Sequence, residues 1–134
     1  MTSIKTHLAS IHVLALHKKD LFQVSHTELK GYDTVIFLAG VSNDPMAEFS
    51  PSENFIQNAA CPAYLAYESK RAGVKRFIYA SSSSVYGIRD EERVTEDLEL
   101  QPLTDYSKFK AECEKIMLNE FDTDQTITIA RPAT

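Results

Sequence analysis

The stretch that decides the fold is Lys75-Arg-Phe-Ile-Tyr-Ala-Ser-Ser-Ser-Ser-Val-Tyr-Gly87. Residues 75–80 read as a buried strand, and four serines, Ser81 to Ser84, follow where that strand ends. A second stretch, Thr104-Asp-Tyr-Ser-Lys-Phe-Lys110, begins a helix that carries Tyr106 and Lys110. Residues four apart share one face of a helix, so the phenol and the ammonium point the same way. The two stretches can therefore bring a hydroxyl, a phenol and an ammonium to one point.

Strand and helix patterns alternate along the chain. We expect strands at 11–16, 34–39, 75–80 and 125–130, separated by helices at 25–30, 51–72 and 104–119. This alternation predicts an α/β fold with a parallel sheet and helices on both faces. Ligands of such sheets bind beyond the carboxyl ends of the strands. The residues at those ends are therefore expected to share one edge of the sheet: Asp20, Gly40, Ser81–Ser84 and Arg131.

Length and composition exclude several classes of protein. The 134 residues suit a single domain with a real core. The net charge is -5 and the basic residues are scattered, which argues against a nucleic-acid partner. No apolar run approaches the roughly 20 residues that span a bilayer, so we expect no membrane partner. The two cysteines lie far apart, fit no metal pattern and indicate reduced thiols in a cytoplasmic protein.

The serine, tyrosine and lysine suggest proton transfer. A phenol has an ordinary pKa of about 10, and a nearby ammonium lowers that pKa by favouring the phenolate. A serine hydroxyl could hold the alcohol or carbonyl oxygen from which the proton moves. Taken singly, a Tyr–Lys pair at this spacing and a run of loop serines are also ordinary surface features. The order of strand, serines, long loop and Tyr-bearing helix is more specific than either part.

In this combination the chain resembles the extended short-chain dehydrogenase/reductases, the NAD-dependent nucleotide-sugar epimerases and dehydratases. The resemblance implies that Ser82 is the catalytic serine, Tyr106 the general base and Lys110 its partner, with Ser83 and Ser84 facing substrate. It implies cofactor contacts from Asp20, Leu21, Ala39, Gly40, Asn58, Ala80 and Ser81, together with Tyr106 and Lys110. Two of these have structural alternatives. Asp20 could simply cap a turn, and Asn58 could bond backbone exposed by a helix defect near 58–61, where Pro62 removes a backbone donor.

The resemblance also implies a reaction. NAD, rather than NADP, would carry a hydride from a sugar carbinol and return it to the other face, which inverts the centre. The 4,6-dehydratases of the family carry an Asp-Glu pair where this chain has Ser83 and Ser84, so an epimerase is favoured over a dehydratase, with a reductase as a further alternative. The resemblance implies a homodimer formed through helices 51–72 and 104–119.

One family motif is missing from the sequence. The four glycines form no Gly-x-x-Gly-x-x-Gly turn, the feature that approaches the cofactor pyrophosphate. The sequence therefore predicts one incomplete Rossmann-type domain, residues 1–134, which lacks the first two strands of the family order 3-2-1-4-5-6. We expect an internal fragment of a longer enzyme, with weak NAD affinity or none. The rival hypothesis is an inactive remnant, or a non-catalytic module that assembles through its two long helices.

Overall fold

The computed structural model describes residues 18–41, 44–121 and 124–133, so the predicted strand at 11–16 lies outside the described residues. Three strands, β1 (Thr34–Phe37), β2 (Arg76–Ala80) and β3 (Thr126–Ala130), form a parallel sheet in the order β1-β2-β3. The predicted parallel α/β arrangement is confirmed. Strand β1 ends at Phe37, two residues earlier than expected, because its pairing with β2 stops at the Phe37–Tyr79 pair.

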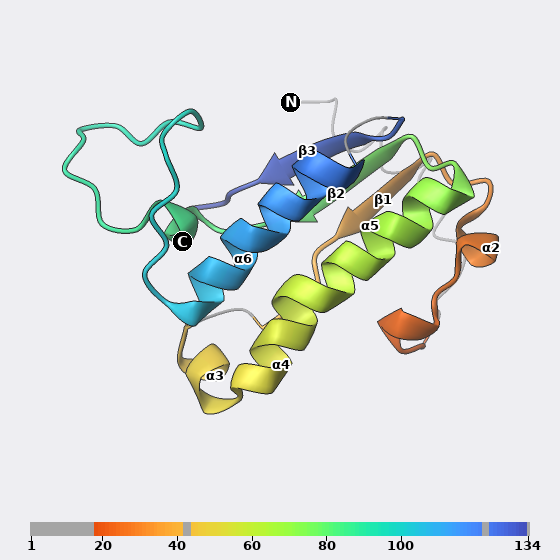
Figure 1. Ribbon diagram of the computed structural model, residues 1–134, viewed down its shortest axis with the longest axis horizontal. Coiled ribbons are helices and arrows are strands. Elements are labelled where there is room, and N and C mark those ends of the chain that lie inside the picture. Colours follow the sequence, from red (N-terminus) through yellow and green to blue (C-terminus); the bar gives the residue numbers. More distant parts are fainter. Residues whose placement is uncertain (1–17, 42–43, 122–123, 134) are drawn as a thin grey trace, which may run out of the picture.

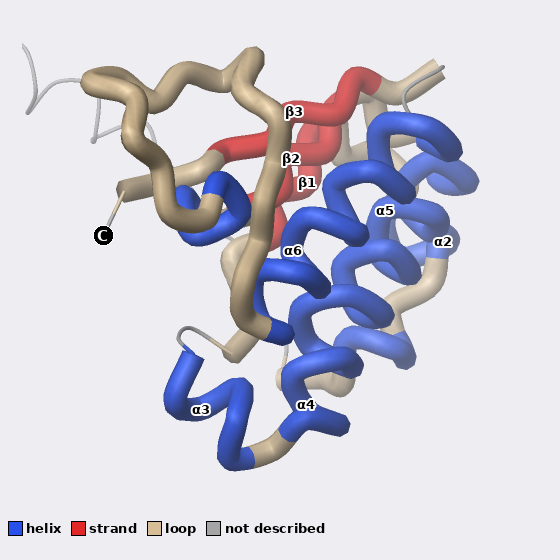
Figure 2. The backbone as a smooth tube through the Cα atoms, turned by 60° about the vertical axis from the view of Figure 1, so that its left-hand side comes forward, coloured by secondary structure: helices blue, strands red, loops and turns tan. Residues whose placement is uncertain are grey.

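Helices connect the strands and pack on the sheet. The described elements are η1 (Leu21–Gln23), α2 (His26–Leu29), α3 (Asp44–Phe49), α4 (Pro51–Phe55), η2 (Ile56–Ala60), α5 (Cys61–Ala72), η3 (Ser83–Tyr86), α6 (Asp105–Ile116) and η4 (Met117–Phe121). The continuous run α4–η2–α5 lies beside α6 across one face of the sheet, as Figure 1 and the turned view in Figure 2 both show. None of the helices in the described part of the chain is long and apolar enough to cross a membrane.

The core lies between these helices and one face of the sheet. Phe77 and Tyr79 of β2 are fully buried there and pack with Leu65 of α5 and Met117 after α6. Alternate strand residues point the other way. Ile36 is one of them and is 59% exposed, so over the described residues the helical layer covers a single face.

The helix defect predicted near residues 58–61 takes the form of a π turn. The Cys61 N–H bonds the Ile56 carbonyl, five residues back. In α-helical geometry the Asn58 carbonyl would accept from the N–H of residue 62, which proline lacks. The Tyr79 hydroxyl donates to that carbonyl instead, at 3.2 Å. Strand β2 thus satisfies the backbone group that Pro62 leaves without a helical donor.

A long excursion, residues 87–103, separates η3 from α6 (Figure 1). It begins at Gly87, which has φ +70°, and a Cβ there would overlap the Gln101 carbonyl. The Gln101 N–H bonds the Val85 carbonyl at 3.0 Å, so the excursion returns close to where it left. This closure brings the chain back to η3, against which α6 packs.

Candidate active site

The four serines form a tight turn at the carboxyl end of β2. The Ser81 N–H bonds the Ala130 carbonyl at 2.8 Å, which extends the β2–β3 ladder by one residue. The Ser83 N–H bonds the Pro132 carbonyl at 3.2 Å, so the exit of β3 also holds the turn. The Ser81 hydroxyl is buried and has no hydrogen-bond partner among the described residues. A buried orphan hydroxyl is uncommon and marks this strand end as polar space suited to a ligand.

Ser82 begins the 3₁₀ turn η3 and is only 8% exposed. Its hydroxyl oxygen accepts two hydrogen bonds from Ser84. The Ser84 N–H donates at 3.2 Å, and the Ser84 hydroxyl donates at 2.9 Å. The predicted catalytic serine is therefore held in a fixed orientation.

Tyr106 is placed by the start of α6. Thr104 caps the helix, accepting from the Ser107 N–H at 3.2 Å, so Tyr106 falls in the first turn. Its ring packs with Val41 and Ala47, and the residue is 8% exposed. Tyr106 therefore lies close to the loop that leaves β1.

Lys110 lies one helical turn further along α6 and is almost completely buried, at 4% exposed. Its ammonium donates to the Ala80 carbonyl at 3.0 Å and lies 4.9 Å from the centre of the Tyr79 ring and 5.9 Å from that of Tyr106. Burial lowers the pKa of Lys110 to about 8, while Cys113 and Glu114 act in the opposite direction. The structure thus joins Tyr106 and Lys110 to the strand end that carries Ser82.

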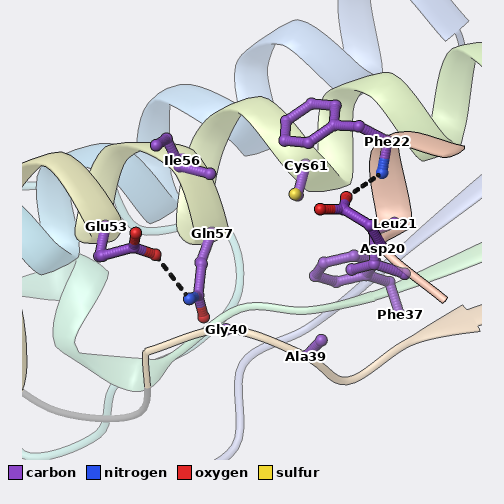
Figure 3. A pocket seen from close by; sticks show the side chains of 10 residues that line it. All are labelled: Asp20, Leu21, Phe22, Phe37, Ala39, Gly40, Glu53, Ile56, Gln57 and Cys61. Atoms are coloured by element: carbon purple, nitrogen blue, oxygen red, sulfur yellow. Dashed lines mark hydrogen bonds between the residues drawn. The ribbon is translucent and has the colours of Figure 1, made fainter. Parts of the chain in front are cut away.

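A cavity of about 540 Å³ opens at the carboxyl end of β1 (Figure 3). Four of the predicted cofactor residues line it: Asp20, Leu21, Ala39 and Gly40. The Asp20 carboxylate accepts from the Phe22 N–H at 2.9 Å and so caps the short turn η1. The structural alternative for Asp20 is therefore realised, and the same carboxylate also borders the cavity.

Asn58, another predicted cofactor residue, is not among the residues that line this cavity. Its amide nitrogen donates to the Val41 carbonyl at 3.2 Å and to the Asn54 side chain at 2.9 Å. A Cβ on Gly40 would lie 2.5 Å from the Asn58 side-chain oxygen. The alternative in which the Asn58 side chain serves the helix defect is wrong, because that side chain holds the loop after β1 and Tyr79 serves the defect.

Six residues of the cavity lining were not anticipated from the sequence: Phe22, Phe37, Glu53, Ile56, Gln57 and Cys61. The Gln57 amide donates to the Glu53 carboxylate at 2.9 Å, and burial raises the pKa of the Cys61 thiol. For three of them the sequence contains a spacing pattern that could have indicated a shared face. Residues 53, 57 and 61 are spaced four apart on one helix, the pattern of a single face, and that face looks toward the strand ends.

Arg131 was expected at a strand end, but its partners were not. The guanidinium makes a paired contact with the buried Glu114 carboxylate, with nitrogen–oxygen distances of 2.6 and 3.2 Å. It also donates to the Tyr86 hydroxyl at 2.7 Å. The Glu114 bond raises the pKa of Arg131. The end of β3, helix α6 and the serine turn are thereby tied together.

These surroundings fit a dinucleotide in part. A carboxylate acceptor beside apolar walls, with a glycine at the strand end, suits the hydroxyl and amine donors of a nucleoside. The orphan Ser81 hydroxyl and the buried Tyr106–Lys110 pair lie at the neighbouring strand end. The glycine-rich turn that would approach a pyrophosphate is not in the sequence.

Comparison with known proteins agrees with this geometry. The model of the NAD dependent epimerase/dehydratase family matches residues 2–134. A curated relative, the N-acetyl-alpha-D-glucosaminyl-diphospho-ditrans,octacis-undecaprenol 4-epimerase of Escherichia coli O157:H7, is 30% identical over 108 residues, which make up 78% of this chain and 31% of that protein. The chain spans less than a third of the length of the curated relatives it matches.

Two solved structures are also similar. UDP-glucuronic acid 4-epimerase from Bacillus cereus, in complex with NAD, has a TM-score of 0.71 and 28% identity over 87% of this chain and 37% of that one. RMD from Pseudomonas aeruginosa, complexed with NADPH, has a TM-score of 0.78 and 26% identity over 97% of this chain and 48% of that one. The chain therefore belongs to the NAD dependent epimerase/dehydratase family.

Proposed function

We propose that the protein containing this chain is an NAD-dependent epimerase of a nucleotide sugar. The observation that carries the proposal is the burial of the Lys110 ammonium between the Ala80 carbonyl and the Tyr106 ring. A lysine is rarely buried without a role, because removing its charge from water is costly. Its place beside a phenol at a strand end suits the activation of that phenol as a base.

The side chains divide the work of proton transfer. Tyr106 takes the proton of a sugar hydroxyl as a carbonyl forms, and gives it back when the alcohol is restored. Lys110, with a pKa of about 8, is mostly charged at neutral pH and favours the phenolate. Ser82 holds the reacting oxygen. Bound NAD supplies the hydride acceptor that the carbinol carbon requires.

We propose NAD rather than NADP as the cofactor. Support comes from the charge of the cavity at the end of β1, where two carboxylates, Asp20 and Glu53, are among the lining residues. Among the described residues that line this cavity, none is a lysine or arginine. Such a lining disfavours the additional phosphate of NADP. The Bacillus cereus epimerase holds NAD, whereas the Pseudomonas aeruginosa protein holds NADPH.

The serine turn favours epimerisation over removal of water. Ser83 and Ser84 lie on the substrate side in this proposal, and neither can serve as the acid or base that removal of water needs. Epimerisation needs only reversible oxidation, which Ser82, Tyr106 and Lys110 can support. Two 4-epimerases among the proteins compared, from Escherichia coli and Bacillus cereus, support this choice.

We also propose a homodimer formed through the two long helical segments, and a cytoplasmic location. Phe55 of α4 and Phe109 of α6 meet with ring centres 5.5 Å apart, and Phe55 is 50% exposed. An apolar pair shared by two neighbouring helices suits a helical interface. Cys61 and Cys113 are free thiols, as a reducing compartment allows.

The test uses the protein made from the complete reading frame that contains these residues. We expect it to bind NAD in a calorimetric titration and to invert one sugar among UDP-, dTDP- and GDP-linked candidates. Tyr106→Phe should retain NAD binding and lose turnover by at least about 100-fold, the usual contribution of a general base. Normal turnover by the Phe variant would refute the catalytic assignment. Formation of a dehydrated or reduced sugar would identify one of the alternative reactions.

A further inference from the structure

The hydroxyl of Ser82 has a fixed hydrogen-bonding direction. A serine oxygen has one proton to donate and two lone pairs with which to accept. Both acceptor positions of Ser82 are taken by Ser84, by its N–H at 3.2 Å and its hydroxyl at 2.9 Å. The only remaining capacity of the Ser82 oxygen is the donation of its own proton.

We infer that Ser84 is a positioning residue that makes Ser82 an obligate hydrogen-bond donor to the reacting oxygen of the substrate. The inference rests on the proposed function. It differs from the direct substrate contact that the resemblance implied for Ser84, because the Ser84 hydroxyl acts here through Ser82.

A fixed donor suits an oxygen that changes from hydroxyl to carbonyl. As the carbon loses its hydride and the oxygen loses its proton, the carbon–oxygen double bond forms and the oxygen remains an acceptor throughout. A donor aimed at it gains strength as negative charge develops there. The chain from the Ser84 hydroxyl to Ser82 to the substrate also polarises the last bond.

The same arrangement decides where the proton goes. With both lone pairs in use, Ser82 cannot accept the substrate proton. The proton must pass to Tyr106, whose ring lies 5.9 Å from the Lys110 ammonium. The serine turn therefore separates the donor role of Ser82 from the base role of Tyr106.

A double-mutant cycle in the complete protein tests this inference. Ser84→Ala removes the hydroxyl donor, and we expect kcat to fall ~3- to 10-fold, the effect of one oriented hydrogen bond, while KM stays within about twofold. Ser84→Thr keeps the hydroxyl and should restore kcat. In a Ser82→Ala background, Ser84→Ala should change kcat by less than about twofold, because its target is already gone.

The matched control is Ser69→Ala, which removes another buried serine hydroxyl, one that bonds the Leu65 carbonyl in α5. It should leave kcat unchanged. An unchanged kcat in Ser84→Ala overturns the inference, and so does an equal loss in the wild-type and Ser82→Ala backgrounds, which would mean that Ser84 contacts substrate directly. Failure of the proposed function is separately visible, because Tyr106→Phe would then turn over normally.

Discussion

Replacement of Lys110 by methionine should stabilise the protein while abolishing its chemistry. The ammonium is buried in the fold, and its pKa falls from the ordinary value of about 10.5 to about 8. At about 1.4 kcal/mol per pKa unit, burial of this charge costs the fold about 3 kcal/mol at neutral pH. Methionine has a similar length and no charge, so it removes this cost.

The net gain is smaller than the cost removed. The variant loses the hydrogen bond to the Ala80 carbonyl and the contacts of the ammonium with two aromatic rings, which together contribute about 1–2 kcal/mol. We therefore expect Lys110→Met to be about 1–2 kcal/mol more stable than wild type at pH 7. Turnover should be lost, because the partner of Tyr106 is gone.

The pH dependence gives the sharper test. Between pH 8 and 10.5 the unfolded chain binds more protons at this lysine than the folded chain does, so wild-type stability rises with pH in that window. The stability difference should therefore move by about 2–3 kcal/mol in favour of wild type between pH 7 and pH 10, with roughly half of this change reached by pH 9. Wild type should then be the more stable of the two at pH 10.

Urea unfolding of the nucleotide-free complete protein at pH 7, 9 and 10 measures this difference. The control is Lys108→Met on the same helix, where the lysine is exposed and pairs with Asp105. Its stability relative to wild type should stay constant across these pH values. A Lys110→Met difference that does not vary with pH would show that Lys110 titrates as an exposed lysine, and the account of the buried ammonium would be wrong.

Three further substitutions test the supports of the site. Tyr79→Phe leaves the buried Asn58 carbonyl without its hydroxyl donor and should lower the unfolding free energy by about 1–3 kcal/mol in urea titrations. Gly40→Ala places a Cβ 2.5 Å from the Asn58 side-chain oxygen at φ +141°, so thermal unfolding should shift down by several degrees and NAD affinity, measured by calorimetry, should fall. Arg131→Met strands the buried Glu114 carboxylate and should destabilise the protein by about 3–5 kcal/mol, whereas the double variant with Glu114→Leu should recover most of that loss.

The parallel arrangement, and the placement of the Tyr106–Lys110 pair at the end of β2, were predictable because both depend on short-range patterns. Residues 75–80 have a strand pattern followed by polar residues, and Tyr106 and Lys110 have helical spacing. A parallel sheet then requires strand ends to meet at one edge, so the position of the site follows from topology. These inferences needed no knowledge of how any side chain packs.

The features that could not be predicted from the sequence depend on contacts between residues far apart in the chain. Nothing in the sequence pairs Arg131 with Glu114, because Arg131 follows β3, Glu114 lies in α6, and only the tertiary fold brings the two side chains together. The exposure of Ile36 is another example. The alternation of strands and helices predicted helices on both faces of the sheet, whereas the described helices cover one. Which face of a strand is covered by helices depends on how distant segments pack, and a local sequence pattern does not determine it.

Tyr79 shows how a structural defect and the candidate site depend on the same side chain. Its hydroxyl satisfies the carbonyl that Pro62 leaves without a helical donor, and its ring lies 4.9 Å from the ammonium of Lys110. Burial raises the pKa of Tyr79, so this phenol stays protonated and keeps donating at any pH where the protein works. A neutral tyrosine can serve both neighbours, because donating its proton to the backbone leaves the ring face free to stabilise the lysine charge. The two tyrosines near Lys110 therefore have opposite requirements. Tyr79 must hold its proton so that the π turn keeps its place, and Tyr106 must release its proton for the chemistry we propose.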